Sequence, residues 1–347
     1  MKLKPRPFLP MQALGLLLAL CAALTPAITQ AQTPSKKLYV FVSPDRLGVN
    51  TFLQQGKSGV EAAAKKHGAA VKTLESSNAS DRAENVRAAL SDGATLVVLL
   101  GFEFADIVEE LAPKSPKTQF LIVDQCIKKP PANVSCATFR EQESAYLLGA
   151  TAALFAKTQR IGVVAALDIP FLRRYTEAYA QGARMAKPGI AVDVRYVGGP
   201  NPFGDPVRAK EQALALRAAG SESIFTATSG GDFGVFDAAR AQGFQVLSVD
   251  SNRCPNVPGL GLDNTLKQVD RVVQQSIDLI EGGGPAQQRS YGLKEGGMGL
   301  MALDVAGLPQ SGCLVATRPD VVQKIRAWAQ DIISGKLVIE DPMTRKR

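Results

Sequence analysis

The sequence predicts an α/β fold of two doubly wound parallel-sheet lobes joined by a hinge. Short apolar runs that suit buried strands alternate with segments of helical periodicity along most of the chain. A second series of the same kind begins after about residue 157. No linker rich in Gly, Pro or Ser separates the two series, so the crossings between them must be short, which suits a hinge.

The first series contains four apolar runs that predict strands and three segments that predict helices. Capping residues mark the helix ends: Ser80 or Asp81 can begin one helix, Gly68 can end another, and Pro113 breaks a third. We expect strands at 38–42, 71–74, 95–100 and 120–123, and helices at 51–66, 81–90 and about 103–111. This alternating order predicts a parallel sheet with helices on both faces.

A further helix is expected to close the first lobe. Thr138 and Glu141 form a capping-box pattern, and apolar residues then recur on one helical face over 147–154. The helix should end near Lys157, because 161–166 is an apolar run typical of a strand buried on both faces. We therefore expect the first junction between the lobes at 157–158.

The second series repeats the pattern of the first. We expect strands at 161–166, 191–197, 224–227 and 246–249, and helices at about 173–186, 206–219, about 234–242, 266–280 and 320–334. The N-terminal lobe is predicted to comprise 36–157 with about 255–290, and the C-terminal lobe 158–254 with about 291–340. The ligand cleft is expected between them.

Residues 1–31 have the parts of a secretory signal peptide. Lys2, Lys4 and Arg6 form a basic region, 14–24 an apolar one, and the chain then reaches a small-residue cleavage site that ends at Ala31. The apolar region is too short to span a membrane. Cys21 follows a leucine, where bacterial lipoprotein signals carry a small residue. We therefore expect export to the periplasm and a soluble mature chain.

The net charge of +8 includes three cations of the predicted signal peptide. The remaining surplus is small and forms no dense Lys/Arg stripe apart from the tail at 345–347, so nucleic acid is not expected as a partner.

The mature chain contains four cysteines, an even number that in an oxidising compartment predicts two disulfides. Three pairings are possible. We prefer Cys126 with Cys136, because the two bracket one short loop, which leaves Cys254 with Cys313.

Polar and aromatic residues gather where predicted strands end. In open parallel sheets, ligands lie at the carboxyl ends of the strands, and Asp124 and Asp250 occupy such ends, one in each lobe. Four phenylalanines fall in or beside these loops, Phe52, Phe102, Phe203 and Phe233. They could sandwich a flat ring while the carboxylates accept hydrogen bonds. The alternative is structural: phenylalanines at such positions often complete the core, and aspartates at strand ends often cap helices.

No catalytic constellation is found. His67 is the only histidine, no nucleophile has a base at a recognisable spacing, and no P-loop or full dinucleotide fingerprint occurs. A zinc site is disfavoured because there is no CxxC pair. We therefore expect a protein that is not an enzyme and holds no metal or cofactor.

Several segments, in order along the chain, resemble the basic membrane protein family of ABC-transporter substrate-binding proteins, whose better-known members are purine nucleoside receptors. The matching runs are GVNTF, LLGFEFADIVEELAPKSPKTQFLIVD, FREQESAYLLGATAALFAKTQRIGVVAAL, GDFGVFDAARAQG, SVDSN, LKQVDRVV and YGLKEGGMGL. The resemblance implies a type I periplasmic-binding-protein fold with a hinge and a ligand cleft.

The resemblance also implies roles for individual residues. Phe52 matches the phenylalanine that stacks on the base, and Asp124 matches the acid that ends a strand. Asp250 and Lys267 match the acid and the lysine that hold the ribose. Asn50, two residues before Phe52, is included among the ligand-binding residues.

A second aromatic is expected from the other lobe, where Phe233 is our choice and Phe225 and Phe236 are substitutes. The family's usual DxSFN is replaced here by Val49-Asn50-Thr51-Phe52-Leu53, which lacks its Asp and its second Asn. A base could still stack on Phe52, but side chains other than the family's Asp and second Asn would form the hydrogen bonds to its edge.

The function implied is that of a periplasmic solute-binding protein of an ABC importer. It would bind a nucleoside-like or other flat, hydroxylated molecule as a monomer and deliver it to a permease with its ATPase, its only contact with the membrane. The alternative is a ligand-sensing periplasmic module that signals to a membrane receptor. An exported hydrolase is disfavoured because no catalytic constellation is found.

Overall fold

The computed structural model describes Met1 and residues 37–344. The predicted signal peptide, Cys21 within it, and the basic tail at 345–347 lie outside the described residues. Within residues 37–344, no helix is both long enough and apolar enough to cross a membrane.

The first sheet has six parallel strands in the order β11-β5-β4-β3-β1-β2. Its strands are β1 (Leu38–Ser43), β2 (Ala70–Glu75), β3 (Leu96–Leu100), β4 (Gln119–Val123), β5 (Val134–Phe139) and β11 (Gln288–Tyr291). Its helices are α1 (Thr51–His67), α2 (Ala79–Ser91), α3 (Ala105–Leu111) and α8 (Val269–Glu281). Four strands and three helices match the sequence expectations closely; β5 and β11 were not predicted.

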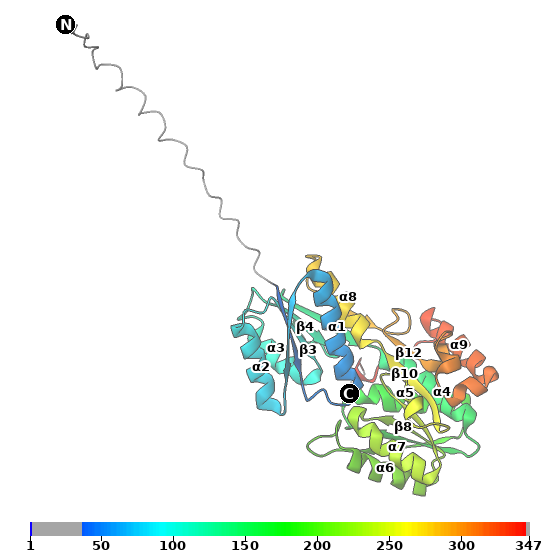
Figure 1. The fold of residues 1–347 in the computed structure, drawn as a ribbon. Coiled ribbons are helices and arrows are strands. Elements are labelled where there is room, and N and C mark those ends of the chain that lie inside the picture. Colours follow the sequence, from blue (N-terminus) through cyan, green and yellow to red (C-terminus); the bar gives the residue numbers. More distant parts are fainter. Residues whose placement is uncertain (2–36, 345–347) are drawn as a thin grey trace. The chain divides into compact units, whose positions relative to one another are not determined.

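Helices cover both faces of this sheet, which makes it doubly wound (Figure 1). Tyr39 and Phe41 of β1 point to the core that includes α1 and α8, whereas Val40 and Val42 point to the core that includes α2 and α3. Because both faces are buried, the central strands are continuously apolar, as in the fully buried LVVLL of β3.

The second sheet has the order β12-β10-β9-β8-β6-β7, with β12 antiparallel to β10 and the other pairs parallel. Its strands are β6 (Arg160–Ala165), β7 (Ala191–Tyr196), β8 (Ser223–Ala227), β9 (Gln245–Ser248), β10 (Gly261–Lys267) and β12 (Met298–Leu300). The sequence did not predict β10 or β12. The helices around it are α4 (Glu141–Phe155), α5 (Pro170–Ala186), α6 (Pro206–Ala218), α7 (Asp232–Gln242) and α9 (Pro319–Ile333).

Short 3₁₀ helices occupy several connections. They are η1 (Phe102–Phe104), η2 (Ser229–Gly231), η3 (Cys254–Asn256), η4 (Met301–Leu303), η5 (Leu308–Gln310), η6 (Leu314–Thr317) and η7 (Pro342–Thr344).

Helix α4 packs against α5 at very close range. Gly149 on α4 and Gly182 on α5 make this possible, because a Cβ at either position would overlap the carbonyl oxygen of the facing helix, that of Tyr179 or of Tyr146. Helix α4 also packs on β10 and β12, so its neighbours belong to the second sheet. We therefore propose that the first crossing between the lobes lies at Arg140, rather than at 157–158.

Two further crossings follow from sheet membership. Strand β10 pairs with β9 in the second sheet, and the chain then enters α8, which packs on α1, so this crossing is at Gln268. The chain returns over 292–297, between β11 and β12. We propose lobes of 37–139 with 269–291 and of 141–267 with 298–344, in place of the boundaries expected near 255 and 290.

Both preferred disulfides are present. Cys126 and Cys136 join the loop after β4 to β5, and Cys254 and Cys313 join η3 to the residue before η6.

Candidate functional site

A pocket lies between the two lobes, at the carboxyl ends of strands from both sheets. Its place agrees with the rule that ligands bind where parallel strands end. The first lobe contributes Pro44, Asp45, Asn50, Phe52, Leu53, Gly101, Phe102, Glu103 and Asp124, and the second contributes Phe171, Leu172, Tyr175, Phe203, Ala227, Ser229, Val249, Asp250 and Lys267.

Backbone strain is concentrated in this pocket. Asp124, Ser229 and Asp250 have φ angles of 80°, 54° and 72°, and they are the only non-glycine residues with positive φ in the described part of the chain. All three line the pocket. Such a conformation costs about 1–3 kcal/mol per residue and persists where surrounding structure enforces it, which is common at ligand sites.

A buried ion network forms one wall of the pocket. The Lys267 ammonium group binds a carboxylate oxygen of Asp124 and, at 3.0 Å, Oε1 of Glu141. All three residues are at most 6% exposed. Burial alone would lower the pKa of Lys267, but the surrounding carboxylates raise it well above its ordinary value. The ammonium group is therefore held in its charged form beside the ligand space.

The network continues away from the pocket. Arg174 on α5 donates to Oε2 of Glu141 at 3.2 Å and to both carboxylate oxygens of Asp341, at 2.9 and 2.6 Å. It also donates to the carbonyl oxygen of Phe139 at 3.0 Å. Because Phe139 and Glu141 flank the first crossing, this network fixes the connection between the lobes.

Aromatic rings from both lobes surround the ligand space. The Lys267 ammonium group lies 4.9 Å from the ring centroid of Phe52 and 5.4 Å from that of Phe171, within cation–π range. Across the cleft, the ring centroid of Phe102 lies 6.2 Å from that of Phe171 and 6.4 Å from that of Phe203. These contacts join the first lobe to the second, so the lobes are closed on one another here.

Acidic groups outnumber cations in the lining. Four carboxylic residues line the pocket, Asp45, Glu103, Asp124 and Asp250, together with a single lysine. Burial raises the pKa of Asp250, against the effect of Lys267 and Arg253, and burial raises the pKa of Glu103 to about 7. A lining of this kind favours a ligand that presents several N–H or O–H donors.

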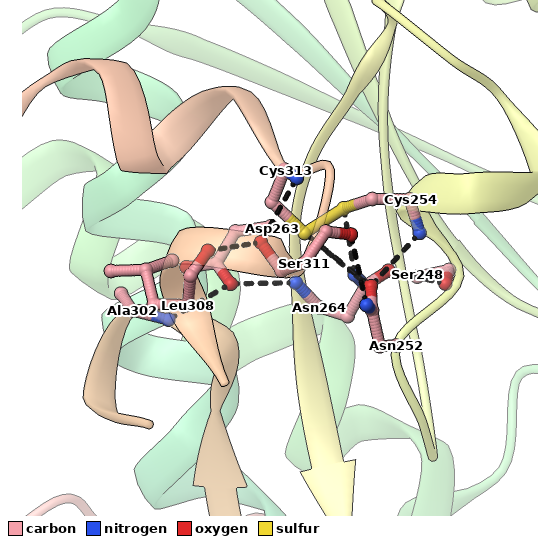
Figure 2. The surroundings of a disulfide bond; sticks show 9 residues. All are labelled: Ser248, Asn252, Cys254, Asp263, Asn264, Ala302, Leu308, Ser311 and Cys313. Carbon is pink, nitrogen blue, oxygen red and sulfur yellow. Dashed lines mark hydrogen bonds between the residues drawn. A yellow bond between two sulfur atoms is a disulfide. The ribbon is translucent and has the colours of Figure 1, made fainter. Parts of the chain in front are cut away.

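The loop that carries Asp250 is held by the second disulfide and its neighbours (Figure 2). Asn252 accepts a hydrogen bond from the Cys254 backbone at 3.1 Å and donates one to the Ser311 carbonyl oxygen at 2.9 Å. Asn264 on β10 donates to the Cys254 sulfur at 3.1 Å. These contacts hold the segment that follows Asp250 against β10 and the loop before η6.

Five of the six ligand-binding residues expected from the sequence line this pocket, namely Asn50, Phe52, Asp124, Asp250 and Lys267. Asn50 also has a structural role, because its side-chain oxygen accepts a hydrogen bond from the Leu53 backbone and caps α1.

Phe233 lies outside the pocket lining. Its ring packs edge to face against Phe236 at 5.7 Å and lies 4.9 Å below the guanidinium group of the buried Arg253. The two substitutes, Phe225 and Phe236, are fully buried in the core. The second lobe instead contributes Phe171, Tyr175 and Phe203.

Phe171, Tyr175 and Glu103 are among the lining residues that the sequence did not indicate. Phe171 and Tyr175 lie one helical turn apart at the start of α5, just after β6, so the strand-end rule could have selected them. Glu103 directly follows Phe102, one of the four phenylalanines named from the sequence. Within residues 37–344, no group of three or more His, Cys, Asp or Glu side chains could hold a metal ion.

Comparison with known proteins gives a consistent result. The family model described as ABC transporter substrate-binding protein PnrA-like matches residues 36–335. The chain is 30% identical over 325 residues to the ABC transporter nucleoside-binding protein BmpA of Lactococcus lactis, which covers 85% of this chain and 87% of that protein. It is 27% identical over 219 residues to basic membrane protein A of Borreliella burgdorferi, covering 60% and 63%.

Solved structures show the same fold. An ABC transporter solute-binding protein from Aeropyrum pernix superposes with a TM-score of 0.76 at 24% identity, covering 89% of this chain and 94% of that one. A second solute-binding protein, from Conexibacter woesei, has a TM-score of 0.69 at 19% identity, covering 88% and 99%. The fold is thus the type I periplasmic-binding-protein fold expected from the sequence.

Proposed function

The chain belongs to the family of PnrA-like ABC transporter substrate-binding proteins, which are not catalytic, and from this membership we propose that its ligand is a purine nucleoside. In this proposal the exported protein closes its lobes on the nucleoside in the periplasm, as a monomer, and delivers it to an ABC permease. The observation that carries the proposal is the pairing, in one interlobe pocket, of aromatic rings with strained, buried polar residues.

The aromatic part of the pocket suits the base. Phe52 from the first lobe and Phe171 from the second both lie within cation–π range of Lys267, so a ring placed beside this ammonium group meets both lobes at once. Base–aromatic stacking is worth about 1–3 kcal/mol per base and tolerates any base, because each has a π-face.

The polar part suits the sugar. Asp250 and Asp124 can accept hydrogen bonds from hydroxyl groups, and the Lys267 ammonium group can donate one. Asp250 is 6% exposed, and its only side-chain hydrogen bond is a long one, 3.4 Å, from Ser229 within the described residues. A ribose hydroxyl would give this carboxylate the strong donor that it lacks.

Delivery to a permease requires that the pocket open. In the closed arrangement, Phe102 of the first lobe packs against Phe171 and Phe203 of the second and covers the ligand space. Opening must separate these rings, and the three chain crossings supply the hinge. The nucleoside-binding BmpA relative supports the choice of ligand class.

The proposal is tested by identifying what the protein carries. The exported protein is purified and denatured, and the released small molecules are identified by mass spectrometry. We expect a purine nucleoside. Release of an aliphatic sugar or an amino acid, with no nucleoside bound when the refolded protein is titrated, would keep the transport role but contradict the ligand class.

A further inference from the structure

Glu103 occupies a distinctive place in the pocket. It lies in η1, directly after β3, and its carboxylate folds back over Gly101, where it occupies the space that a Cβ would need. The φ of 116° at Gly101 also favours glycine there. Its neighbour Phe102 is the ring that crosses the cleft to Phe171 and Phe203. Glu103 and Phe102 both line the pocket, which makes Glu103 a candidate to contact a base held among the aromatic rings.

The cations around the pocket have other partners. Lys267 is bound to Asp124 and Glu141. Arg82 lies 3.6 Å from Asp45 and donates to the carbonyl oxygen of Pro44 at 2.9 Å. In the part of the chain that the structure describes, Glu103 forms no ion pair with a lysine or arginine. The Glu103 backbone N–H donates to this carboxylate. Because the two carboxylate oxygens together offer about four lone pairs, acceptor capacity remains that a ligand can use.

We propose that Glu103 reads the edge of the bound base and selects a 2-amino-6-oxopurine, the guanine type, over a 6-aminopurine, the adenine type. The inference rests on the proposed function, since it specifies which nucleoside this same pocket takes. An ionised carboxylate has two acceptor oxygens and no donor. The guanine edge presents two neighbouring donors, N1–H and N2–H, which a carboxylate can accept together, whereas the adenine edge places an acceptor, N1, beside its amino donor.

The protonation state of Glu103 links this choice to pH. Burial raises its pKa to about 7, with Arg82 on α2 acting in the opposite direction and Asp45 and Asp124 adding to the rise. Above this pH the carboxylate matches guanine. Below it the protonated carboxyl group offers one donor and one acceptor and matches adenine. The ratio of guanosine to adenosine affinity should therefore increase as the pH rises from 6 to 8.

The test is calorimetric titration of guanosine and adenosine at pH 6 and pH 8 into the wild type and two variants. Glu103→Gln offers one donor and one acceptor at either pH. It should bind guanosine about tenfold more weakly than the wild type at pH 8, retain adenosine, and lose the pH dependence of the ratio. Glu109→Gln, on the exposed side of α3, is the matched control and should behave as the wild type.

Each contrary result has a distinct meaning. A guanosine-to-adenosine ratio that is the same in Glu103→Gln as in the wild type overturns the role of Glu103 while leaving the proposed function intact. A wild-type ratio that does not change between pH 6 and pH 8 also overturns that role, and it needs no variant. Failure of the folded wild type to bind either nucleoside overturns the proposed function itself, and with it this assignment.

Discussion

Lys267 is the residue on which the wall of the pocket depends, because its one ammonium group pairs with two buried carboxylates, Asp124 and Glu141. Buried ion pairs contribute little net stability compared with apolar residues, but removal of one partner leaves an uncompensated charge. Removal of Lys267 should therefore lower the stability of the fold by more than the small net contribution of its ion pairs.

We predict that Lys267→Met lowers the free energy of unfolding by about 3–5 kcal/mol near pH 8. The loss should be smaller at pH 5, since burial raises the pKa of Glu141 and this carboxyl group can then take up a proton. Urea unfolding measures it, with Lys57→Met as the control, because Lys57 forms only an exposed pair with Glu61. Equal losses in the two variants would mean that the buried network is not strongly coupled to folding.

Phe52 and Phe233 provide a matched pair for the stacking role. Both lie at the start of a helix that follows a strand end, but only Phe52 lines the pocket. Phe52→Ala should weaken nucleoside binding by about 1–3 kcal/mol. Phe233→Ala should leave binding close to wild type, because its ring faces Phe236 and Arg253. Calorimetric titration measures the affinity of both variants for the nucleoside. An unchanged affinity in Phe52→Ala would contradict stacking of the base on Phe52.

The same pair shows how far a sequence can identify a site. The strand-end rule, aided by the family resemblance, selects loops, and it located five of the six expected residues in one pocket. It cannot tell which side chain of a loop points into the cleft, since that depends on the orientation of the helix that follows. Phe233 turns toward its own lobe, whereas Phe171, on a helix that was predicted to begin only after it, turns to the ligand space.

At the scale of elements, the central strands that could be predicted are buried on both faces and built from apolar residues. The edge strands β2 and β7 are partly exposed, but they could be predicted from valines alternating with polar residues or from their place in the α/β order. The missed strands have no continuous apolar run. Strand β10 is almost wholly buried but carries Asp263, Asn264, Thr265 and Lys267, and β11 reads QRSY at the edge of its sheet. Their pairing partners, rather than their own composition, make them strands.

The contact between α4 and α5 makes a prediction at this scale. Gly149→Ala would place a methyl group on the carbonyl oxygen of Tyr179, so the helices must move apart. We expect a loss of at least about 1–3 kcal/mol in stability, measured by thermal unfolding. Gly284→Ala is the control, since the nearest atom to its added Cβ is 3.9 Å away, on Gln287. A wild-type melting temperature in both variants would contradict the close packing of α4 on α5.

At the scale of the whole molecule, the three crossings lie beside the ion network that lines the pocket. Arg140, at the first crossing, donates to Glu143 at 2.6 Å and also binds Glu295, which lies in the third crossing. Gln268, at the second crossing, donates from its backbone to Gly297 at 2.9 Å. Lys267 directly precedes Gln268, so a shift of the Lys267 backbone in the pocket would also move the second crossing, one peptide unit away.

The position of α4 could not be predicted from the sequence at this scale. Twelve of its residues are buried, so no polar stripe indicates which lobe it belongs to. The strand after it looked like the start of a new lobe, and only the packing of α4 on α5, β10 and β12 places the helix with the second sheet.

The central claim is that the interlobe pocket binds a purine nucleoside, and calorimetric titration of the exported protein at pH 8 tests it most directly. Guanosine, guanine and ribose are titrated separately. We predict one guanosine bound per chain, with much weaker binding of guanine or ribose alone, because the rings hold the base and the buried polar groups hold the sugar. Absence of guanosine and adenosine binding in a folded sample, at concentrations where another class of solute binds, would contradict the account.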